Sequence, residues 1–270
     1  MVRIEGLKID LDNTFGSGQN FRWKRCADGS YLGNVQGRAV KAAVRADALE
    51  LDGAQAEDEA FWRRYFDADS DYDALLCDVM DEHLRQAMTE CSGIRVLNQP
   101  FFETLCCFIL SANNNIRRIT GIVDRFCAIA PQDANGIHVF PTPQQVLSAG
   151  RDWVDSIGAG YRAPYLWEAA QRMADGFDAD ALCEMDYSQA CDCIRQFKGV
   201  GEKVADCVLL FSCGHRAAFP VDTWVEKILV QWYGMEGTRS KLKKQAMAHF
   251  GAYGGVAQQY LFLQAMRQKI

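Results

Sequence analysis

The spacing of hydrophobic residues changes near residue 57 of the chain. Before that point, short apolar runs and a near alternation of apolar and polar residues are typical of strands. The segment Ala27-Asp28-Gly29 lies between two such runs and is a hairpin-turn signal. We therefore predict a small antiparallel sheet, with strands at residues 4–11, 20–24, 31–35, 40–44 and 48–51.

From residue 57 onward, apolar residues recur three and four positions apart, which indicates helices. The stretch from Pro100 to Leu110 is almost entirely apolar and predicts a buried helix that ends at the three asparagines 113–115. The predicted fold class is α+β: a small N-terminal sheet domain, residues 1–98, followed by a mostly helical domain, residues 99–270. Further helices are predicted at residues 142–149, 163–175, 187–197, 202–213, 223–233, 240–249 and 254–268.

The composition excludes several classes of protein. The chain has 270 residues, 49% of them hydrophobic and 24% charged, which is ordinary for a globular protein and not for a disordered one. No window approaches 18 uncharged apolar residues, so we expect no membrane span. Charges at Arg3, Glu5, Lys8 and Asp10 argue against a signal peptide, and we expect a cytoplasmic protein.

The cysteines indicate free thiols and not disulfides or metal ligands. There are eleven, an odd number, and no two of them form a C-x-x-C pair. The chain has only four histidines, none at ligand spacing from a cysteine. We therefore expect neither a structural metal ion nor a cofactor.

Charge is distributed unevenly, although the net charge is only −6. Residues 47–92 carry fourteen acidic residues against three arginines, whereas residues 193–270 carry eleven basic residues against five acidic ones. The local field matters more than the total for binding a polyanion. A basic C-terminal third is therefore compatible with DNA binding, although charge runs are usually only solvated faces.

The segment from about residue 188 to 213 predicts two helices joined by a tight turn. The turn is Gly199-Val200-Gly201, and the second helix begins at Glu202. Glycines allow a sharp turn close to another surface, and a helix N-terminus offers free N–H groups to phosphate. This pattern is typical of a grip on the DNA backbone, and an ordinary helix–helix turn is the alternative.

An amine and a carboxylate follow this turn. Lys203 and Cys207 are four residues apart and share one helix face. Asp222 comes shortly after Pro220 and is predicted to cap the next helix. An amine and a carboxylate in one cleft are suited to imine chemistry. Taken singly, each has a simpler alternative, a solvated lysine and a plain helix cap.

Together these residues resemble the helix-hairpin-helix DNA glycosylases with a Gly/Pro-rich loop and a closing Asp, in their 8-oxoguanine DNA glycosylase/AP lyase branch. Four more segments match that family in its order: Gly18-Gln-Asn-Phe-Arg-Trp23, Ile109-Leu-Ser-Ala-Asn-Asn-Asn-Ile116 with Arg118, Gly160-Tyr-Arg-Ala163 and Gly255-Val-Ala-Gln-Gln-Tyr-Leu-Phe262. The resemblance covers almost the whole chain.

The resemblance implies a role for each matching residue. Lys203 is the nucleophile that forms a Schiff base with the sugar, and Asp222 stabilises the cationic sugar. Base recognition falls to Gly18, Cys207, Gln258 and Phe262, because a flipped purine would lie between the cysteine sulfur and the phenylalanine ring. Gln258 would meet the Watson–Crick edge of the base, and the Gly18 carbonyl would detect the extra proton on N7 of 8-oxoguanine.

The resemblance also implies how the DNA is held. Asn113 fills the gap left by the flipped base, Arg118 and Arg162 pair with the orphaned cytosine, and Tyr161 acts as a wedge. The backbone contacts are assigned to Gly199, Val200, Gly201 and Trp224. The expected partner is double-stranded DNA that contains 8-oxoguanine, bound by a monomer that is associated with the nucleoid if the source is a prokaryote.

The chain departs from the family pattern at two positions. Lys198 stands where the family often has proline, and Trp224 stands where eukaryotic members have histidine. The iron–sulfur cysteines of related glycosylases are absent. Two alternative functions are a related glycosylase for another damaged base and a non-catalytic helix-hairpin-helix module that binds DNA.

Overall fold

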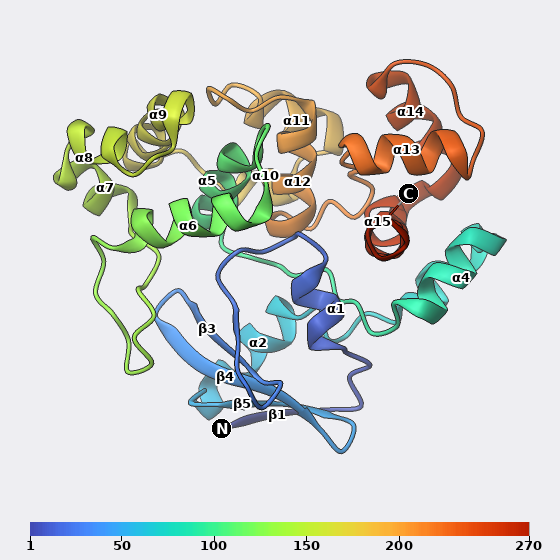
Figure 1. Cartoon of the computed structure of the whole chain (residues 1–270), viewed down its shortest axis with the longest axis horizontal. Helices are drawn as coiled ribbons and strands as arrows, with labels where there is room; N and C mark the ends of the chain where they lie inside the picture. Colours follow the sequence, from blue (N-terminus) through green and yellow to red (C-terminus); the bar gives the residue numbers. More distant parts are fainter. Residues whose placement is uncertain (270) are drawn as a thin grey trace.

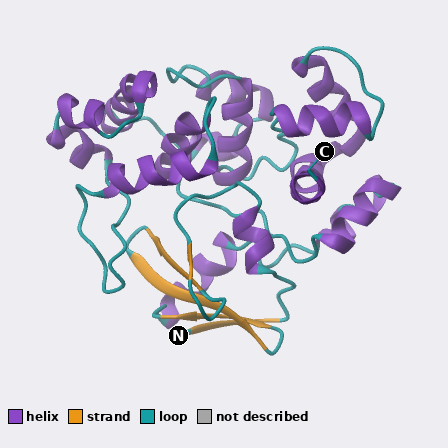
Figure 2. Ribbon diagram, viewed as in Figure 1, coloured by secondary structure: helices purple, strands orange, loops and turns teal. Residues whose placement is uncertain are grey.

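The N-terminal part of the protein is built on one antiparallel sheet. The computed structural model describes residues 1–269, and its five strands follow the order β1-β5-β4-β3-β2. Figures 1 and 2 show this sheet on one side of the molecule, opposite most of the helices. The predicted α+β fold class is confirmed. The strands are β1 Val2–Glu5, β2 Lys24–Arg25, β3 Tyr31–Val35, β4 Arg38–Arg45 and β5 Ala48–Asp52.

The predicted turn at residues 27–29 joins β2 to β3, and Gly29 adopts a φ of +83° there. The predicted strand at residues 4–11 is wrong. β1 ends at Glu5, and helix α1, Leu11–Gly16, begins after Asp10, whose carboxylate accepts from the Asn13 N–H at 2.7 Å. The predicted strand at 20–24 is also mostly wrong, since only its last residue enters β2.

The residues of α1 turn their apolar side chains toward the sheet and close a small aromatic core. Phe15 stacks on Trp23 with ring centroids 4.5 Å apart, and Phe66 and the fully buried Trp62 pack beside them. This burial favours a helix at positions where the local pattern favours a strand. The elements that follow the sheet are η1 Ala56–Asp58, α2 Glu59–Tyr65, α3 Tyr72–Leu75, η2 Cys77–Val79 and α4 Glu82–Glu90.

The helical part is organised around α5, Phe101–Ser111. Nine of its eleven residues are buried, which confirms the predicted apolar helix after Pro100. It packs against α12, Glu202–Ser212. The other helices of this part are α6 Ile116–Cys127, α7 Pro143–Ala149, α8 Arg151–Ser156, η3 Gly160–Arg162, α9 Ala163–Ala174, α10 Ala181–Glu184, α11 Tyr187–Ile194, α13 Thr223–Gln231, α14 Arg239–Phe250, η4 Gly251–Tyr253 and α15 Gly254–Gln268.

All seven further helices predicted from periodicity are present. The helix predicted at 187–197 ends early, at Ile194, because the chain turns there and buries Phe197 against Phe177, with ring centroids 4.8 Å apart. The short helices α8 and α10 were not predicted. Among residues 1–269, no helix is both long and apolar enough to cross a membrane.

Buried polar contacts fix the segment before β2 against residues 95–97 and against α5. The side chain of Gln19 donates to the Arg95 carbonyl and accepts from the Leu97 N–H, both at 2.8 Å. Arg22 forms a buried ion pair with Glu103 of α5 at 3.0 Å. Gly18 lies directly before this anchored segment, so its backbone has a defined position relative to the helices.

Candidate active site

The turn before α12 places Lys203 at the start of that helix. Gly199 has a φ of +82°, and a Cβ built there would lie 2.4 Å from the Tyr165 ring, so this position requires glycine. The Lys203 Nζ atom donates to the Ser111 hydroxyl at 3.2 Å and lies 5.2 Å from the centroid of the Phe108 ring. The amine is therefore held over the C-terminal end of α5.

Asp222 caps α13, as its sequence position predicts. Its Oδ1 atom accepts from the N–H groups of Trp224 and Val225, each at 2.9 Å. Within residues 1–269, Oδ2 has no hydrogen-bond partner, and no carboxylate lies within 4.0 Å of the Lys203 amine. The amine and one carboxylate oxygen are thus both available to a substrate in the cavities that they line.

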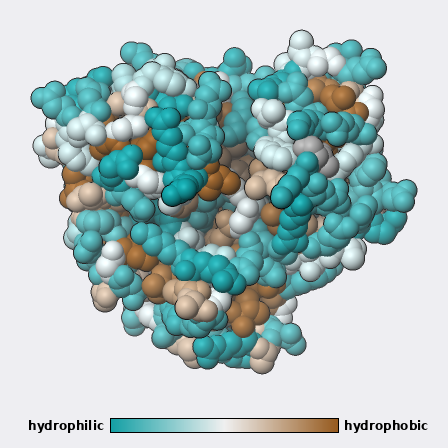
Figure 3. Space-filling model, in the orientation of Figure 1, coloured by the Kyte–Doolittle hydropathy of each residue, from teal (hydrophilic) through white to brown (hydrophobic). Residues whose placement is uncertain are grey.

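Two adjoining cavities share Lys203 and Asp222 as lining residues. The inner cavity has a volume of about 40 Å³, and the outer one has about 480 Å³ and extends to Trp224. The face drawn in Figure 3 is mostly hydrophilic and is hollowed between its two helical sides. The inner cavity brings together both predicted catalytic residues and all four predicted base-recognition residues: Gly18, Lys203, Cys207, Asp222, Gln258 and Phe262.

The walls of the inner cavity differ in chemistry. Burial raises the pKa of the Cys207 thiol to about 12, so this side chain is a neutral contact surface at physiological pH. Gly18 has a φ of +73°, and a Cβ there would lie 3.4 Å from the Phe262 ring. Gln258 is buried and supplies an amide. The cavity thus combines a sulfur, an aromatic ring, an amide and an uncovered stretch of backbone.

A third cavity, of about 570 Å³, separates the asparagine loop from the hairpin turn. Asn113 lines one side with a φ of +47°, a conformation that asparagine tolerates better than most residues. Gly199, Gly201 and Trp224 line the other side. Val200, which was also predicted to contact the DNA backbone, is buried and does not line this cavity.

The residues predicted to meet the orphaned cytosine lie apart from the three cavities around Lys203. Arg162 is buried, and its guanidinium donates to the carbonyls of Ala112 and Asn113, the latter at 3.1 Å. It also lies 4.2 Å from the ring centroid of Tyr161, which is itself exposed. Arg118 is exposed on α6. In this structure Arg162 supports the asparagine loop.

Two residues at the site were not predicted. Ser111, the hydrogen-bond partner of Lys203, lies within the asparagine motif, and that position was the only signal for it. Gln259 lines the inner cavity beside Gln258. A neighbouring glutamine has no distinctive pattern, so only the packing shows its position.

A buried ion pair lies behind α12, the second helix of the hairpin. The fully buried Asp206 accepts from Tyr187 of α11 and lies 2.7 Å from the Lys243 amine of α14. Burial raises the pKa of Asp206 to about 6, although the pairing with Lys243 lowers it. The carboxylate is therefore charged at neutral pH and connects three helices around the turn.

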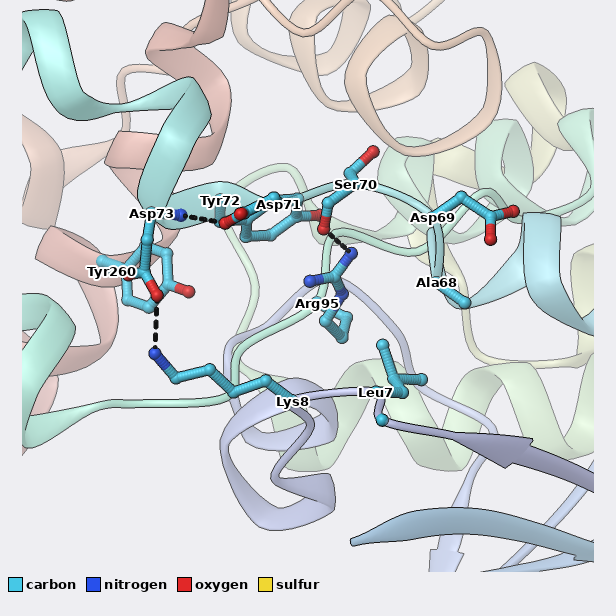
Figure 4. A pocket seen from close by; sticks show the side chains of 11 residues that line it. Leu7, Lys8, Ala68, Asp69, Ser70, Asp71, Tyr72, Asp73, Arg95 and Tyr260 are labelled. Atoms are coloured by element: carbon cyan, nitrogen blue, oxygen red, sulfur yellow. Dashed lines mark hydrogen bonds and ion pairs between the residues drawn. The ribbon is translucent and has the colours of Figure 1, made fainter.

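A further cavity, of about 320 Å³, lies beside the N-terminal part, between the loop at residues 6–8 and Tyr260 (Figure 4). Its charged groups are paired with their neighbours. Lys8 forms an ion pair with Asp73 at 2.8 Å, and Arg95 donates to the Ser70 carbonyl at 2.9 Å. This cavity does not include any of the predicted site residues.

Known proteins match the chain over nearly its full length. The structure of MBOgg1 in complex with a low-affinity DNA ligand has a TM-score of 0.95 and 33% identity, and the match covers 99% of this chain and 96% of that one. The Clostridium acetobutylicum 8-oxoguanine glycosylase/lyase, in complex with double-stranded DNA that has cytosine opposite 8-oxoguanine, has a TM-score of 0.92 and 31% identity over 97% of this chain and 93% of its own. The N-glycosylase/DNA lyase OGG1 of Arabidopsis thaliana is 28% identical over 97% of this chain and 79% of that protein.

Family comparisons divide the chain into two matched regions. Residues 1–105 match the 8-oxoguanine DNA glycosylase N-terminal domain, and residues 106–252 match the HhH-GPD superfamily base excision DNA repair protein. The chain belongs to the HhH-GPD superfamily of base excision DNA repair proteins, and within it to the 8-oxoguanine DNA glycosylase/AP lyase family. It is a DNA N-glycosylase and DNA lyase.

Proposed function

We propose that this enzyme removes 8-oxoguanine from double-stranded DNA through a Schiff base on Lys203 and then cleaves the abasic strand by β-elimination. The observation that carries the proposal is the inner cavity, where an amine without an ion pair among residues 1–269 and a carboxylate adjoin the predicted base-recognition residues. The two reacting groups and the surfaces for the base thus share one site.

The damaged nucleotide must leave the duplex to reach this site. The inner cavity, of about 40 Å³, is narrow beside the outer cavity of about 480 Å³ that it adjoins. Phe262 is only half-buried and also lines the larger outer cavity. Movement of this ring would open the space beside Cys207, and the base would then lie between the sulfur and the ring.

The chemistry then follows from the amine and the carboxylate. The Lys203 nitrogen attacks C1′ of the sugar, the bond from C1′ to the base breaks, and the base leaves with the bonding electrons and gains a proton. The nitrogen then loses one proton, and the bond from C1′ to the ring oxygen breaks as that oxygen gains a proton, which leaves a protonated imine. Removal of a proton from C2′ then expels the 3′ phosphate. Asp222 stabilises the positive charge that develops on the sugar.

The remaining predicted residues would hold the DNA around this site. Asn113 faces the groove opposite the hairpin and would enter the gap in the duplex, with Tyr161 as the wedge. The backbone of residues 199–201 and Trp224 would contact phosphates. Arg118 and Arg162 would donate to the orphaned cytosine, and for this Arg162 must exchange its present carbonyl partners for the base.

Cytosine preference follows from the chemistry of these arginines. A guanidinium has only donors, and an unpaired cytosine offers O2 and N3 as acceptors, whereas adenine turns an amine toward the same side. We also propose that the enzyme acts as a monomer in the cytoplasm, at the nucleoid if the cell is a prokaryote.

The decisive experiment is a nicking assay on duplexes that hold one 8-oxoguanine opposite each of the four normal bases. Wild-type enzyme should nick the lesion strand, fastest opposite cytosine, and borohydride should trap a covalent complex. Lys203→Gln should abolish both signals, because no amine remains to form the imine. A trapped complex with this variant would show that another amine is the nucleophile, and efficient release of a different base would favour the alternative glycosylase.

A further inference from the structure

Helix α15 turns two consecutive glutamines toward the inner cavity. Gln258 and Gln259 are only 4% and 3% exposed, and both line the cavity. The Gln259 Nε2 atom donates to the Gln258 Oε1 atom at 2.8 Å. The Gln259 Oε1 atom is buried and accepts no hydrogen bond from residues 1–269. Among residues 1–269, an unsatisfied acceptor thus lies in the wall of the inner cavity.

Buried acceptors without a donor are rare because desolvation is costly, so each one calls for an explanation. Within residues 1–269, Asn20 Nδ2 and Trp62 Nε1 also lack partners, and Asp206 Oδ2 has only its ion pair with Lys243, but none of these three residues lines this cavity. In the larger cavity of Figure 4, Lys8 and Arg95 do not call for a ligand in the same way, because both are already paired with protein groups. The unpaired acceptor of Gln259 therefore belongs to the site where a base would bind.

The ligand that satisfies this acceptor must bring donors. The Watson–Crick edge of a guanine-type base carries two adjacent donors, the N1–H and the exocyclic 2-amine. An adenine-type edge carries an acceptor at N1, which would face a carbonyl oxygen. The Gln258 oxygen has a second lone pair, because a carbonyl can accept two hydrogen bonds. Two neighbouring amide oxygens thus match the guanine-type edge.

We infer that Gln259 is a specificity-determining residue, whose Oε1 accepts from the 2-amine of the flipped base while its Nε2 holds the Gln258 oxygen toward N1–H. This inference rests on the proposed function. It adds a second amide to base recognition, next to the one that the sequence predicts. Gln259 takes no part in bond breaking, so the lyase step on an abasic site does not require it.

The test compares Gln259→Met with Gln264→Met. Gln264 is also buried on α15, but it pairs with Glu90 at 3.1 Å and does not line the cavity, so it controls for the loss of a buried amide. Single-turnover excision would be measured on duplexes with 8-oxoguanine or 8-oxohypoxanthine, which lacks the 2-amine, opposite cytosine. Nicking of a preformed abasic site would be measured in parallel.

We expect wild-type enzyme to excise 8-oxoguanine about tenfold faster than 8-oxohypoxanthine, the effect of one hydrogen bond. Gln259→Met should lower the rate on 8-oxoguanine about tenfold more than the rate on 8-oxohypoxanthine, because both bases lose the positioning of Gln258 toward N1–H but only 8-oxoguanine loses a partner for its 2-amine. The variant should nick the abasic site at the wild-type rate. Gln264→Met should retain all three rates. Gln259→Leu, with melting temperatures for every variant, provides a second substitution if methionine impairs folding.

Equal losses on both lesion bases, or a parallel loss at the abasic site, would overturn the inference and make Gln259 a structural residue. An unchanged rate on 8-oxoguanine would overturn it as well. Failure of the proposed function has a different signature, because wild-type enzyme would then excise neither lesion base.

Discussion

The glycine at position 199 offers a sharp test of how the hairpin positions the Lys203 amine. In Gly199→Ala, the new Cβ would lie 2.4 Å from Cδ2 and 2.8 Å from Cγ of Tyr165. These atoms are near the base of the ring, so a rotation of its far end cannot relieve the contact. The φ of +82° adds a second penalty, since a left-handed conformation costs a residue with a Cβ about 1–2 kcal/mol.

Gly176 provides a matched control for the backbone penalty. It is exposed like Gly199 and has a φ of +93°, but no atom lies within 4 Å of the position of its Cβ. The free energy of unfolding of Gly176→Ala should therefore fall only by the cost of the left-handed conformation, about 1–2 kcal/mol. For Gly199→Ala the free energy of unfolding should fall by roughly 1–3 kcal/mol more, which is the usual cost of overpacking. Urea denaturation of both variants measures the difference in the free energy of unfolding.

Relief of the contact requires the turn to move away from Tyr165, and the turn leads directly into the helix that carries Lys203. We therefore expect Gly199→Ala to nick an abasic-site duplex more slowly under single-turnover conditions, while Gly176→Ala retains the wild-type rate. If the two variants are equally stable and equally active, the turn has enough freedom to absorb a methyl group and the reasoning is refuted.

Four further predictions concern charge. Asp222→Asn should lose most nicking activity but still bind DNA, because asparagine retains the helix cap and not the charge; wild-type turnover would reduce Asp222 to a cap. Arg162→Ala should lose most of the preference for cytosine over adenine opposite the lesion, measured as the ratio of excision rates, and an unchanged ratio would remove Arg162 from that role. DNA affinity should fall steeply between low and physiological salt despite the net charge of −6, since the basic C-terminal third releases counterions at each phosphate; a flat titration would contradict this. Burial raises the pKa of the Asp206 carboxyl from 3.8 to about 6. The protonated carboxyl therefore contributes its full stability below pH 3.8, and this contribution is lost as the pH rises through 6. The free energy of unfolding should fall over this range in wild type relative to Asp206→Asn, and parallel pH curves would disprove it.

The helices of the C-terminal part could be predicted because local signals agree there. Apolar spacing defines each helix face, and Asp222 marks a helix start that the structure also shows. The N-terminal part was harder. Leu11 and Phe15 form a helix only because the sheet and Trp23 offer them a core, and such long-range packing leaves no periodic signal.

The candidate site likewise combines residues that motifs predict with contacts that only the packing determines. Family motifs identified six of the residues that line the inner cavity, although Gly18 and Phe262 are far apart in the chain. The role of Gln259 depends on the direction of one buried amide, and the contact of Ser111 depends on how α5 meets α12. Likewise, no sequence pattern indicates that Arg162 is buried under the asparagine loop.

The anchoring of Gly18 by Gln19 has a consequence for how mutations act on this enzyme. The amine and the carboxylate belong to the helical part, whereas the carbonyl assigned to sensing the lesion belongs to the segment held against residues 95–97. Loss of those hydrogen bonds would leave Lys203 and Asp222 in place but would loosen the Gly18 carbonyl, the proposed sensor of the lesion. Substitutions of Gln19 should therefore produce an enzyme that nicks abasic DNA at a normal rate but discriminates less well between damaged and normal bases.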